Sequence, residues 1–345
     1  MRQVQIRPAH LDADRDRLIA LLKQYSTVRS TPERFRWMYL DNPHGRAAVF
    51  LAVDELTGEI VGSGAVLPRR MWVAGAVQTA CIMADFWIHP DYRSLGPAVK
   101  LQRACIEHAA AAGFAFYDLP QGNMAAVYRR MGLLGADRLP RFAKPVRTGP
   151  FLERRLHSRL LARPVALLGD LLLRASDWRC ARQSRLRSEV HAGDFGRDFD
   201  RLTQASSATP GIRAVRDAEY LQWRFRRHYH LRHTVITARD GENLAGYAVT
   251  VRADDYVDVV DLFPPSDPEA AGALLAAVVR KARQDGAVGI AVSALGAEGP
   301  LTTAFLKFGL RERDSRPFIV HLFPAAHASR PDAGAWYLTY GDIDY

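Results

Sequence analysis

A weak internal repeat constrains the fold of this chain more than any other feature of its sequence. Four segments of the first half recur in the second half in the same order. The pairs begin at Asp14 and Asp198, Arg34 and Tyr220, Ile60 and Leu244, and Val127 and Ala304. Their separations are 184, 186, 184 and 177 residues. One short match could be chance, but four in register indicate two copies of one domain.

The length agrees with a duplication. The chain has 345 residues, which suits two domains of roughly 150 residues each. We expect a first copy over 1–146, a basic helical linker over 147–187, a diverged second copy over 188–324 and a C-terminal tail over 325–345.

Hydrophobic periodicity gives the outline of the first copy. The expected strands are 3–7, 49–53, 59–67, two strands within 71–88 around a turn at Gly75, and 115–119. The expected helices are 12–24, 98–112 and 124–131, and in the middle one His108 shares a face with Leu101 and Cys105. The pattern predicts an α+β fold: two domains in tandem, each a mixed, mostly antiparallel sheet flanked by helices.

The linker is rich in Arg and Leu. Its leucines could form an amphipathic helix, broken or kinked at Pro164. Two interpretations stay open: a helical linker packed between the domains, or a segment that contacts an anionic membrane surface or a carrier protein.

Charge and cysteine content narrow the functional classes. The net charge is +10 with a pI of about 9.8. Such a surface attracts nucleic acid, anionic lipid, a phosphorylated cofactor or an acidic carrier protein, although a preference for Arg over Lys would give the same total. Three widely spaced cysteines indicate neither a disulfide framework nor a zinc site. Without an apolar signal core or a spanning segment, we expect a cytoplasmic protein.

The most informative segment is 85–98, where a strand leads through Arg-x-x-Gly-x-Ala into a helix. Amides at a helix start lack intrahelical partners and, with the helix dipole, form an anion site. Gly96 permits close approach of a phosphate, and Arg93 adds a permanent positive charge.

This segment resembles the pyrophosphate loop of the GCN5-related N-acetyltransferase (GNAT) superfamily. Arg93, Gly96 and Ala98 fall on the loop positions, and His89, Pro90 and Tyr92 match the run before them. The resemblance implies that the loop holds the diphosphate of acetyl-CoA or another acyl-CoA, without a metal. The implied cofactor-binding residues are Ile88, Arg93, Ser94, Leu95, Gly96, Pro97, Ala98 and Asn123. Pro97 departs from the pattern and removes one amide donor, which a first helical turn tolerates.

The resemblance also suggests catalytic residues. The run Asn123 to Leu133 is similar to the family's Asn…Tyr-x-x-x-Gly-Phe segment, whose Tyr protonates the departing thiolate, so Tyr128 is the candidate acid. Asp85, in an otherwise apolar strand, is the candidate base or substrate contact. The alternatives are an aromatic packing residue for Tyr128 and a hydrogen-bonded structural carboxylate for Asp85.

The second copy lacks these groups. Around Asp267 and Glu269, acids replace the Arg and the loop glycine, and they would repel a diphosphate. Phe305 stands where the first copy has Tyr128. We expect this copy to shape the acceptor site or to stabilise the assembly.

Two further segments are similar to GNAT-type proteins associated with bacterial exopolysaccharide biosynthesis: 37–45 and 336–345. Neither has an obvious core role. The C-terminal segment could fold back to contact substrate or could form a strand that completes a sheet.

The leading expectation is an N-acyltransferase that moves an acyl group from CoA to an amine, such as an amino sugar or polysaccharide precursor. One alternative uses long-chain acyl-CoA or acyl carrier protein. Another is a noncatalytic GNAT-fold binding or scaffold protein. Nucleic acid is not an expected partner, because no nucleic-acid-binding motif accompanies the charge; peripheral membrane contact is compatible with it.

Overall fold

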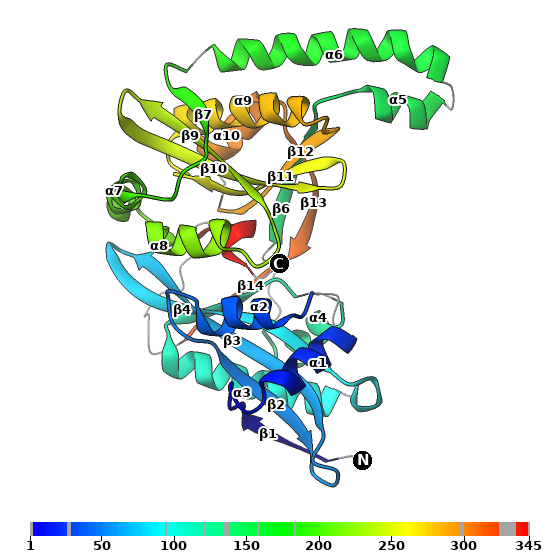
Figure 1. Ribbon diagram of the computed structural model, residues 1–345, viewed down its shortest axis with the longest axis vertical. Helices are drawn as coiled ribbons and strands as arrows, with labels where there is room; N and C mark the ends of the chain where they lie inside the picture. The colour runs from blue at the N-terminus through cyan, green and yellow to red at the C-terminus, as the bar shows by residue number, and fades with distance from the viewer. Residues whose placement is uncertain are drawn as a thin grey trace.

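The computed structural model describes residues 3–25, 29–93, 95–120, 122–133, 138–156, 159–182, 184–296, 300–323 and 336–343. Within them the chain forms two α/β halves joined by one continuous sheet, with a long helix at the outer end of the second half (Figure 1).

The first half follows the expected order of elements. Its strands are β1 (Val4–Pro8), β2 (Ala48–Asp54), β3 (Ile60–Val73), β4 (Ala76–Ile88), β5 (Ala115–Asp118) and β6 (Arg138–Pro145). Its helices are α1 (Arg15–Tyr25), α2 (Pro32–Phe35), the π-helix η1 (Arg36–Leu40), the 3-10 turn η2 (Pro90–Tyr92), α3 (Leu95–Ala112) and α4 (Met124–Arg130).

The second half repeats this order. Its strands are β7 (Arg187–His191), β8 (Ile212–Ala214), β9 (His233–Asp240), β10 (Asn243–Ala253), β11 (Tyr256–Phe263), β12 (Gly289–Leu295), β13 (Arg311–Pro317), β14 (Ile319–Leu322) and β15 (Trp336–Thr339). Its helical elements are α7 (Arg197–Ala205), η3 (Ser206–Ala208), α8 (Ala218–Leu221), the π-helix η4 (Gln222–Arg226), α9 (Pro268–Gln284), α10 (Pro300–Lys307) and η6 (Tyr340–Asp342).

Strand pairing is the same in both halves. In the first, β1, β2, β3 and β4 pair antiparallel in succession, and β5 joins β4 in parallel. In the second, β7, β9, β10 and β11 do likewise, and β12 joins β11 in parallel. Both series are mixed and mostly antiparallel, which confirms the predicted α+β class of sheet.

The halves exchange strands at their contact. β6 of the first half lies between β12 and β13 of the second, and β14 of the second pairs with β5 of the first. β15 lies between β8 and β12, and β8 pairs in turn with β3, so the sheet is unbroken from one half to the other. The predicted boundary at residue 146 therefore falls directly after a strand that pairs only across the halves.

Two equivalent aromatic residues make a near-symmetrical contact between the halves. The rings of Trp37 in η1 and Trp223 in η4 stack with centroids 4.7 Å apart. Each indole donates to the other's main chain: Trp37 Nε1 to the Trp223 carbonyl at 3.0 Å, and Trp223 Nε1 to the Trp37 carbonyl at 2.9 Å. These residues belong to the second segment pair of the sequence repeat.

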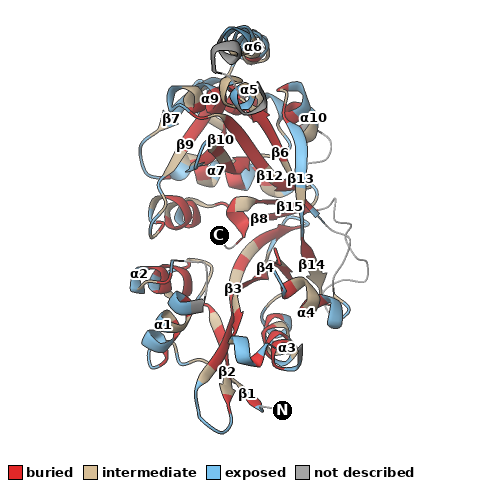
Figure 2. Cartoon of the chain, turned by 90° about the vertical axis from the view of Figure 1, so that its right-hand side faces the viewer, coloured by how far each residue is buried: buried red, intermediate tan, exposed pale blue. Residues whose placement is uncertain are grey.

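Buried hydrophobic residues form two clusters, and the larger is shared by both halves. Figure 2 shows buried residues along the strands of both halves. The smaller cluster lies between the first half's sheet and the helices α3 and α4. Along α3, burial recurs at Leu101, Cys105 and Ala109, whereas His108 is exposed. His108 therefore does not belong to the buried face with Leu101, and it lies against Phe50 at the surface.

Three sequence predictions differ from the observed elements. Residues 59–67 and the start of 71–88 form one strand, β3, because Pro68 does not interrupt its pairing with β4. The linker forms α5 (Gly149–Leu156) and α6 (Arg159–Ala181), and α6 continues through Pro164 without a break. The segments 37–45 and 336–343 both supply core residues, including Tyr39 and Trp336 at 1% exposure.

Candidate active site in the first half

The candidate site lies where β4 and β5 part. Their parallel ladder has three residue pairs, from Ala80–Ala115 to Ile82–Tyr117. β5 ends at Asp118, while β4 continues to Ile88. A crevice beyond the carboxyl ends of parallel strands is the usual ligand position in such sheets.

The loop after β4 is held from both ends. The phenol of Tyr92 donates to Asp54 Oδ2 at 2.5 Å, and His89 Nδ1 accepts from the Asp91 amide at 3.2 Å. Arg93 Nε donates to the Ile88 carbonyl at 3.2 Å while the residue as a whole stays exposed. These bonds hold the main chain from the end of β4 to Arg93.

α3 begins at Leu95, so Gly96, Pro97 and Ala98 lie in its first turn, whose amides have no intrahelical partners. Gly96 is exposed, whereas Pro97 and Ala98 are buried against the body of the half. Pro97 sits where an amide would have no helical acceptor, which explains why the helix tolerates it. Ser94, one of the predicted cofactor residues, lies outside the described residues, and the Leu95 side chain is likewise not described.

Tyr128 is fully buried on α4 and packs against Phe116. Its hydroxyl donates to Asp118 Oδ2 at 2.6 Å and accepts from Gln102 Nε2 at 3.0 Å. Burial, followed by the Asp118 carboxylate, raises the pKa of Tyr128 well above its usual value of 10. The phenol therefore stays protonated at neutral pH and can act there as a donor but not as a base.

Asp85 lies in a bulge of β4 and adopts a φ of +48°, which is unusual for a residue with a side chain. Both of its oxygens accept from Arg34, each at 2.8 Å, and Oδ2 also accepts from the Tyr39 hydroxyl. The side chains of Asp85 and Arg34 are 2% and 4% exposed. These are the contacts of a structural carboxylate, the alternative weighed for Asp85 from the sequence.

The sequence prediction missed the partners of both candidate residues. Asp118 and Gln102 hold Tyr128, and Arg34 and Tyr39 hold Asp85. A signal was present for Asp118, because a carboxylate that ends a short buried strand is costly unless it is bonded. Asn123 stands at the N-cap position of α4 with an exposed side chain.

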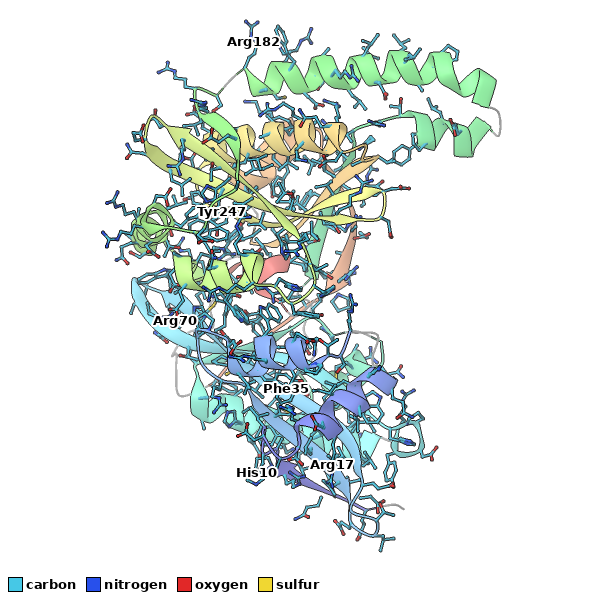
Figure 3. The ribbon with its side chains drawn as sticks, viewed as in Figure 1. His10, Arg17, Phe35, Arg70, Arg182 and Tyr247 are labelled. Carbon is cyan, nitrogen blue, oxygen red and sulfur yellow. The ribbon has the colours of Figure 1, made fainter. Side chains whose placement is uncertain are left out.

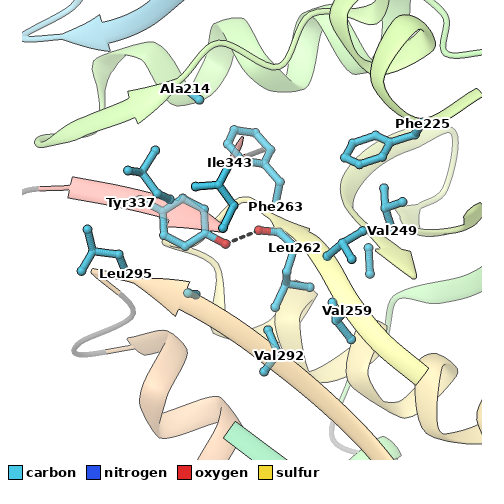
Figure 4. Packing of buried hydrophobic residues seen from close by; sticks show 14 of the residues in the cluster. Ala214, Phe225, Val249, Val259, Leu262, Phe263, Val292, Leu295, Tyr337 and Ile343 are labelled. Atoms are coloured by element: carbon cyan, nitrogen blue, oxygen red, sulfur yellow. Dashed lines mark hydrogen bonds between the residues drawn. The ribbon is translucent and has the colours of Figure 1, made fainter. Parts of the chain in front are cut away.

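In the second half, the corresponding opening between β11 and β12 is filled by the chain itself. β15 pairs with β12 at Ala294–Thr339 and Leu295–Leu338. The Tyr337 hydroxyl donates to the Leu262 carbonyl at the end of β11 (Figure 4). A Cβ at Gly341 would lie 2.9 Å from the Val260 carbonyl oxygen, so the tail is in close contact with this edge of β11.

A buried charge network holds the tail in place. Asp342 accepts from Arg69 of β3 at 2.8 Å and from Arg216 at 2.5 Å, and Arg216 also donates to Asp261 of β11 at 3.1 Å. Tyr117 of β5 donates to the Asp342 main-chain carbonyl at 2.8 Å. Burial alone would raise the pKa of Asp342, but Arg216 and Arg69 outweigh it and the pKa is lowered. One carboxylate thus joins strands of both halves.

A small cavity lies at the contact between the halves, next to this network. Its volume is about 20 Å³, and Trp37, Tyr220, Trp223 and Arg224 are among its lining residues. That volume is enough for a water molecule.

Comparison with known proteins agrees with this geometry. Residues 15–133, about a third of the chain, match the sequence model of the acetyltransferase (GNAT) family. No curated protein sequence matches the chain. Residues 15–133 are therefore similar to the acetyltransferase (GNAT) family in sequence, and this segment contains the β4–α3 loop and Tyr128.

Solved structures share the fold over both halves. A GCN5-related N-acetyltransferase from Anabaena variabilis has 15% identity and a TM-score of 0.62, over 92% of this chain and 73% of that one. One from Kribbella flavida has 14% identity and a TM-score of 0.62, over 93% and 72%. Eis1 from Mycobacterium abscessus has 15% identity and a TM-score of 0.54, over 93% and 73%. At these identities the likeness concerns the fold.

No helix among the described residues is both long enough and apolar enough to cross a membrane. No group of three or more His, Cys, Asp or Glu side chains among them is placed to hold a metal ion.

Proposed function

We propose that this chain is an acyl-CoA-dependent N-acyltransferase, most simply an N-acetyltransferase, that acts on an amine acceptor such as an amino sugar or a polysaccharide precursor. One observation carries the proposal. β4 continues past the end of β5 and is followed by η2 and then by α3, whereas the same opening in the second half is filled by β15.

The residues around this opening suit a diphosphate-bearing thioester. The first-turn amides of α3 and the exposed Arg93 provide positive potential for phosphate oxygens. Gly96 offers an approach without a side chain. The main chain of Met83 to Ile88 would offer donors and acceptors to an extended ligand, as a strand edge does. When bound, an acyl thioester supplies an activated acyl carbon for attack by an amine.

Tyr128 is the proposed donor to the departing sulfur. Its raised pKa keeps the proton on the phenol at neutral pH, and Asp118 and Gln102 fix its position. The single O–H donates to Asp118 in this structure, so it would have to turn from that carboxylate to the sulfur when the thioester is bound. A strongly raised pKa makes hydrogen-bond donation easier than complete proton transfer. Asp85 stays a prediction as a base. Its contacts with Arg34 and Tyr39 support a role in positioning η1 against β4.

Calorimetric titration with acetyl-CoA tests the proposed binding site. We expect one binding site per chain, in the first half, because β15 occupies the opening in the second. Arg93→Glu should weaken binding by about tenfold or more through loss of one charge and gain of its opposite. Arg201→Glu makes the same charge change on the exposed face of α7 and serves as the control.

A thiol-release screen over amine acceptors tests the reaction. Release that depends on an amino sugar would support the proposed substrate class. Thiol release from long-chain acyl-CoA or acyl carrier protein, but not from acetyl-CoA, would identify the longer acyl thioester as the donor in place of acetyl-CoA. Tight acetyl-CoA binding without release for any amine would favour a noncatalytic binding protein.

A further inference from the structure

The helix α6 carries an exposed apolar stripe that packing within the chain does not explain. Residues turned toward the body recur at 166, 169, 170, 173, 177 and 180, one side of a helix. The opposite side is apolar and exposed: Val165 50%, Leu167 68%, Leu168 61%, Leu171 62%, Leu172 65% and Trp178 57%. Solitary exposed leucines are ordinary, but a continuous stripe on one helix indicates a contact surface.

The inner side of α6 is firmly attached. Asp177 accepts from Lys144 and from Arg283 of α9. Near the middle of the helix, Asp170 accepts from the Thr148 amide at 2.7 Å and from its hydroxyl at 2.8 Å. A Cβ at Gly169 would come within 2.9 Å of Thr148 Oγ1, so the glycine permits this close approach. The apolar stripe is therefore held outward by bonds on the other face.

Positive charge is concentrated on the same segment. Residues 147–187 contain ten Arg and three acidic residues, a net charge of +7 within a chain whose total is +10. On α6, Arg174 and Arg179 are exposed beside the leucines. Arg182, exposed just after the helix, lies over the Trp178 ring at 4.3 Å (Figure 3). Apolar side chains bordered by arginines, with a tryptophan at one end, are typical of helices that lie in a membrane interface.

The location of the helix suits such a contact. α5 and α6 form a hairpin at the outer end of the second half, at the far side from the β4–β5 opening (Figure 1). A flat surface could reach this hairpin without covering the candidate active site.

We propose that the α5–α6 hairpin docks on an anionic phospholipid surface, with the leucines of α6 inserted at the interface and its arginines on the lipid phosphates. Charge complementarity favours an anionic surface over a second copy of the chain. In a dimer formed through this hairpin, two segments that each carry a net charge of +7 would repel each other. The docking places an acyltransferase next to lipid-linked or membrane-associated acceptors, and it does not depend on the proposed activity.

Vesicle sedimentation with the full chain tests the proposal. We expect binding to phosphatidylcholine vesicles that contain phosphatidylglycerol and about tenfold weaker binding to phosphatidylcholine alone, with a further loss at high salt. Leu168→Asp with Leu171→Asp should reduce binding by about tenfold or more, because both apolar contacts are lost. Leu306→Asp, at an exposed leucine of α10 that is 45% accessible, is the matched control and should bind as the parent does.

Two further measurements make the test decisive. Trp178 fluorescence, obtained as the difference from Trp178→Phe, should shift to the blue on anionic vesicles. Light scattering gives the oligomeric state of the parent and the double variant, and circular dichroism shows whether the variant is folded. Equal binding of parent and folded double variant, or no binding by the parent, would overturn the proposal. So would a dimer that the double variant converts to monomers.

Discussion

At the scale of single residues, the structure separates side chains that hold the site from those that could act in it. Tyr128 and Asp85 are both buried and both bonded, but in different ways. Tyr128 has one carboxylate and one amide as partners, and it lies next to the end of β5. Asp85 has its oxygens engaged by a guanidinium and a phenol. The contacts of Tyr128 hold a hydrogen-bond donor in position, whereas those of Asp85 hold α2 and η1 against β4.

Replacement of Tyr128 by Phe should lower kcat by about a hundredfold while KM for acetyl-CoA changes little, because only the donor to the sulfur is removed. Steady-state kinetics with the best acceptor from the screen measure this. Tyr256→Phe removes a hydroxyl from β11 of the second half and is the control. An unchanged kcat in Tyr128→Phe would assign the phenol to packing.

Replacement of Asp85 by Asn should destabilise the protein by about 3 to 5 kcal/mol, because Arg34 would stay buried without its anion. Thermal unfolding monitored by circular dichroism measures the loss. A variant with parental stability, no activity and an altered pH profile would instead support the role as a base.

Three histidines near the contact between the halves give the stability a pH dependence. Burial, then nearby arginines, lowers the pKa of His228 to about 2 and of His233 to about 4, and shifts that of His44 in the same direction. Each binds its proton more readily when unfolded. The contribution of these neutral histidines to the free energy of unfolding is fully present above the pKa of unfolded histidine, near 6.5. It declines as the pH falls below that value toward the pKa values of the folded state.

We therefore expect the free energy of unfolding to fall by roughly 2 to 4 kcal/mol between pH 7.5 and 5.5. Urea unfolding at the two pH values measures it. His228→Asn should flatten the dependence, whereas substitution of the exposed His108 should not. A parental protein equally stable at both pH values would contradict the assignment of these groups as buried and neutral.

At the scale of elements, the tail strand β15 is the most consequential feature. It joins β8 to β12, closes the opening of the second half and delivers Asp342 to Arg69 and Arg216. Its register depends on Gly296, where φ is +67° and an added Cβ would lie 1.5 Å from the Trp336 carbonyl oxygen. No side chain fits there unless β15 moves.

Gly296→Ala should lower the unfolding midpoint much more than Gly241→Ala does. Both glycines have positive φ, so both substitutions carry the left-handed penalty of about 1 to 2 kcal/mol. A Cβ at Gly241 meets nothing within 4 Å, so the difference between the variants reports the displacement of β15 alone. Equal midpoints for the two would show that β15 does not depend on this contact.

The sequence predicted the elements better than their connections. Periodicity located α3, β5 and α4 to within a few residues, because each has a buried face and a clear end signal. It divided β3 into two strands, although the pairing of β3 with β4 continues through Pro68. The exchange of β6 and β14, and the position of β15, depend on pairings between distant strands that no local pattern records.

For the candidate site, too, the sequence predicted the local motif but not the contacts between separate elements. Arg93, Gly96 and Ala98 follow one another in a short loop, so a local motif could identify them. The partners of Tyr128 and Asp85 come from separate elements: Gln102 from α3, Asp118 from β5 and Arg34 from α2. Their roles depend on packing, so they emerge only from the fold.

At the scale of the whole molecule, the two halves share one sheet, one large buried cluster and one charge network. The Trp37–Trp223 pair adds a near-symmetrical contact at their junction. A chain with two similar halves could unfold in two steps, but these shared parts couple the steps.

We accordingly expect a single cooperative unfolding transition by calorimetry, with coincident midpoints from circular dichroism and tryptophan fluorescence. Trp37→Ala should lower that midpoint, and the transition should stay single, because the exchanged strands still connect the halves. Two resolved transitions in the parental protein would show that the halves are independent.

The exchange of strands also has a consequence for biosynthesis. β6 leaves the ribosome long before β12 and β13, the strands it pairs with, and β5 emerges well before β14. The nascent first half must therefore wait with unpaired strand edges while about half of the chain is still being translated. A truncated chain released before β12 to β14 are synthesised would keep those strand edges unpaired and accessible to chaperones and proteases. Truncated chains should therefore be degraded more readily than the full-length protein.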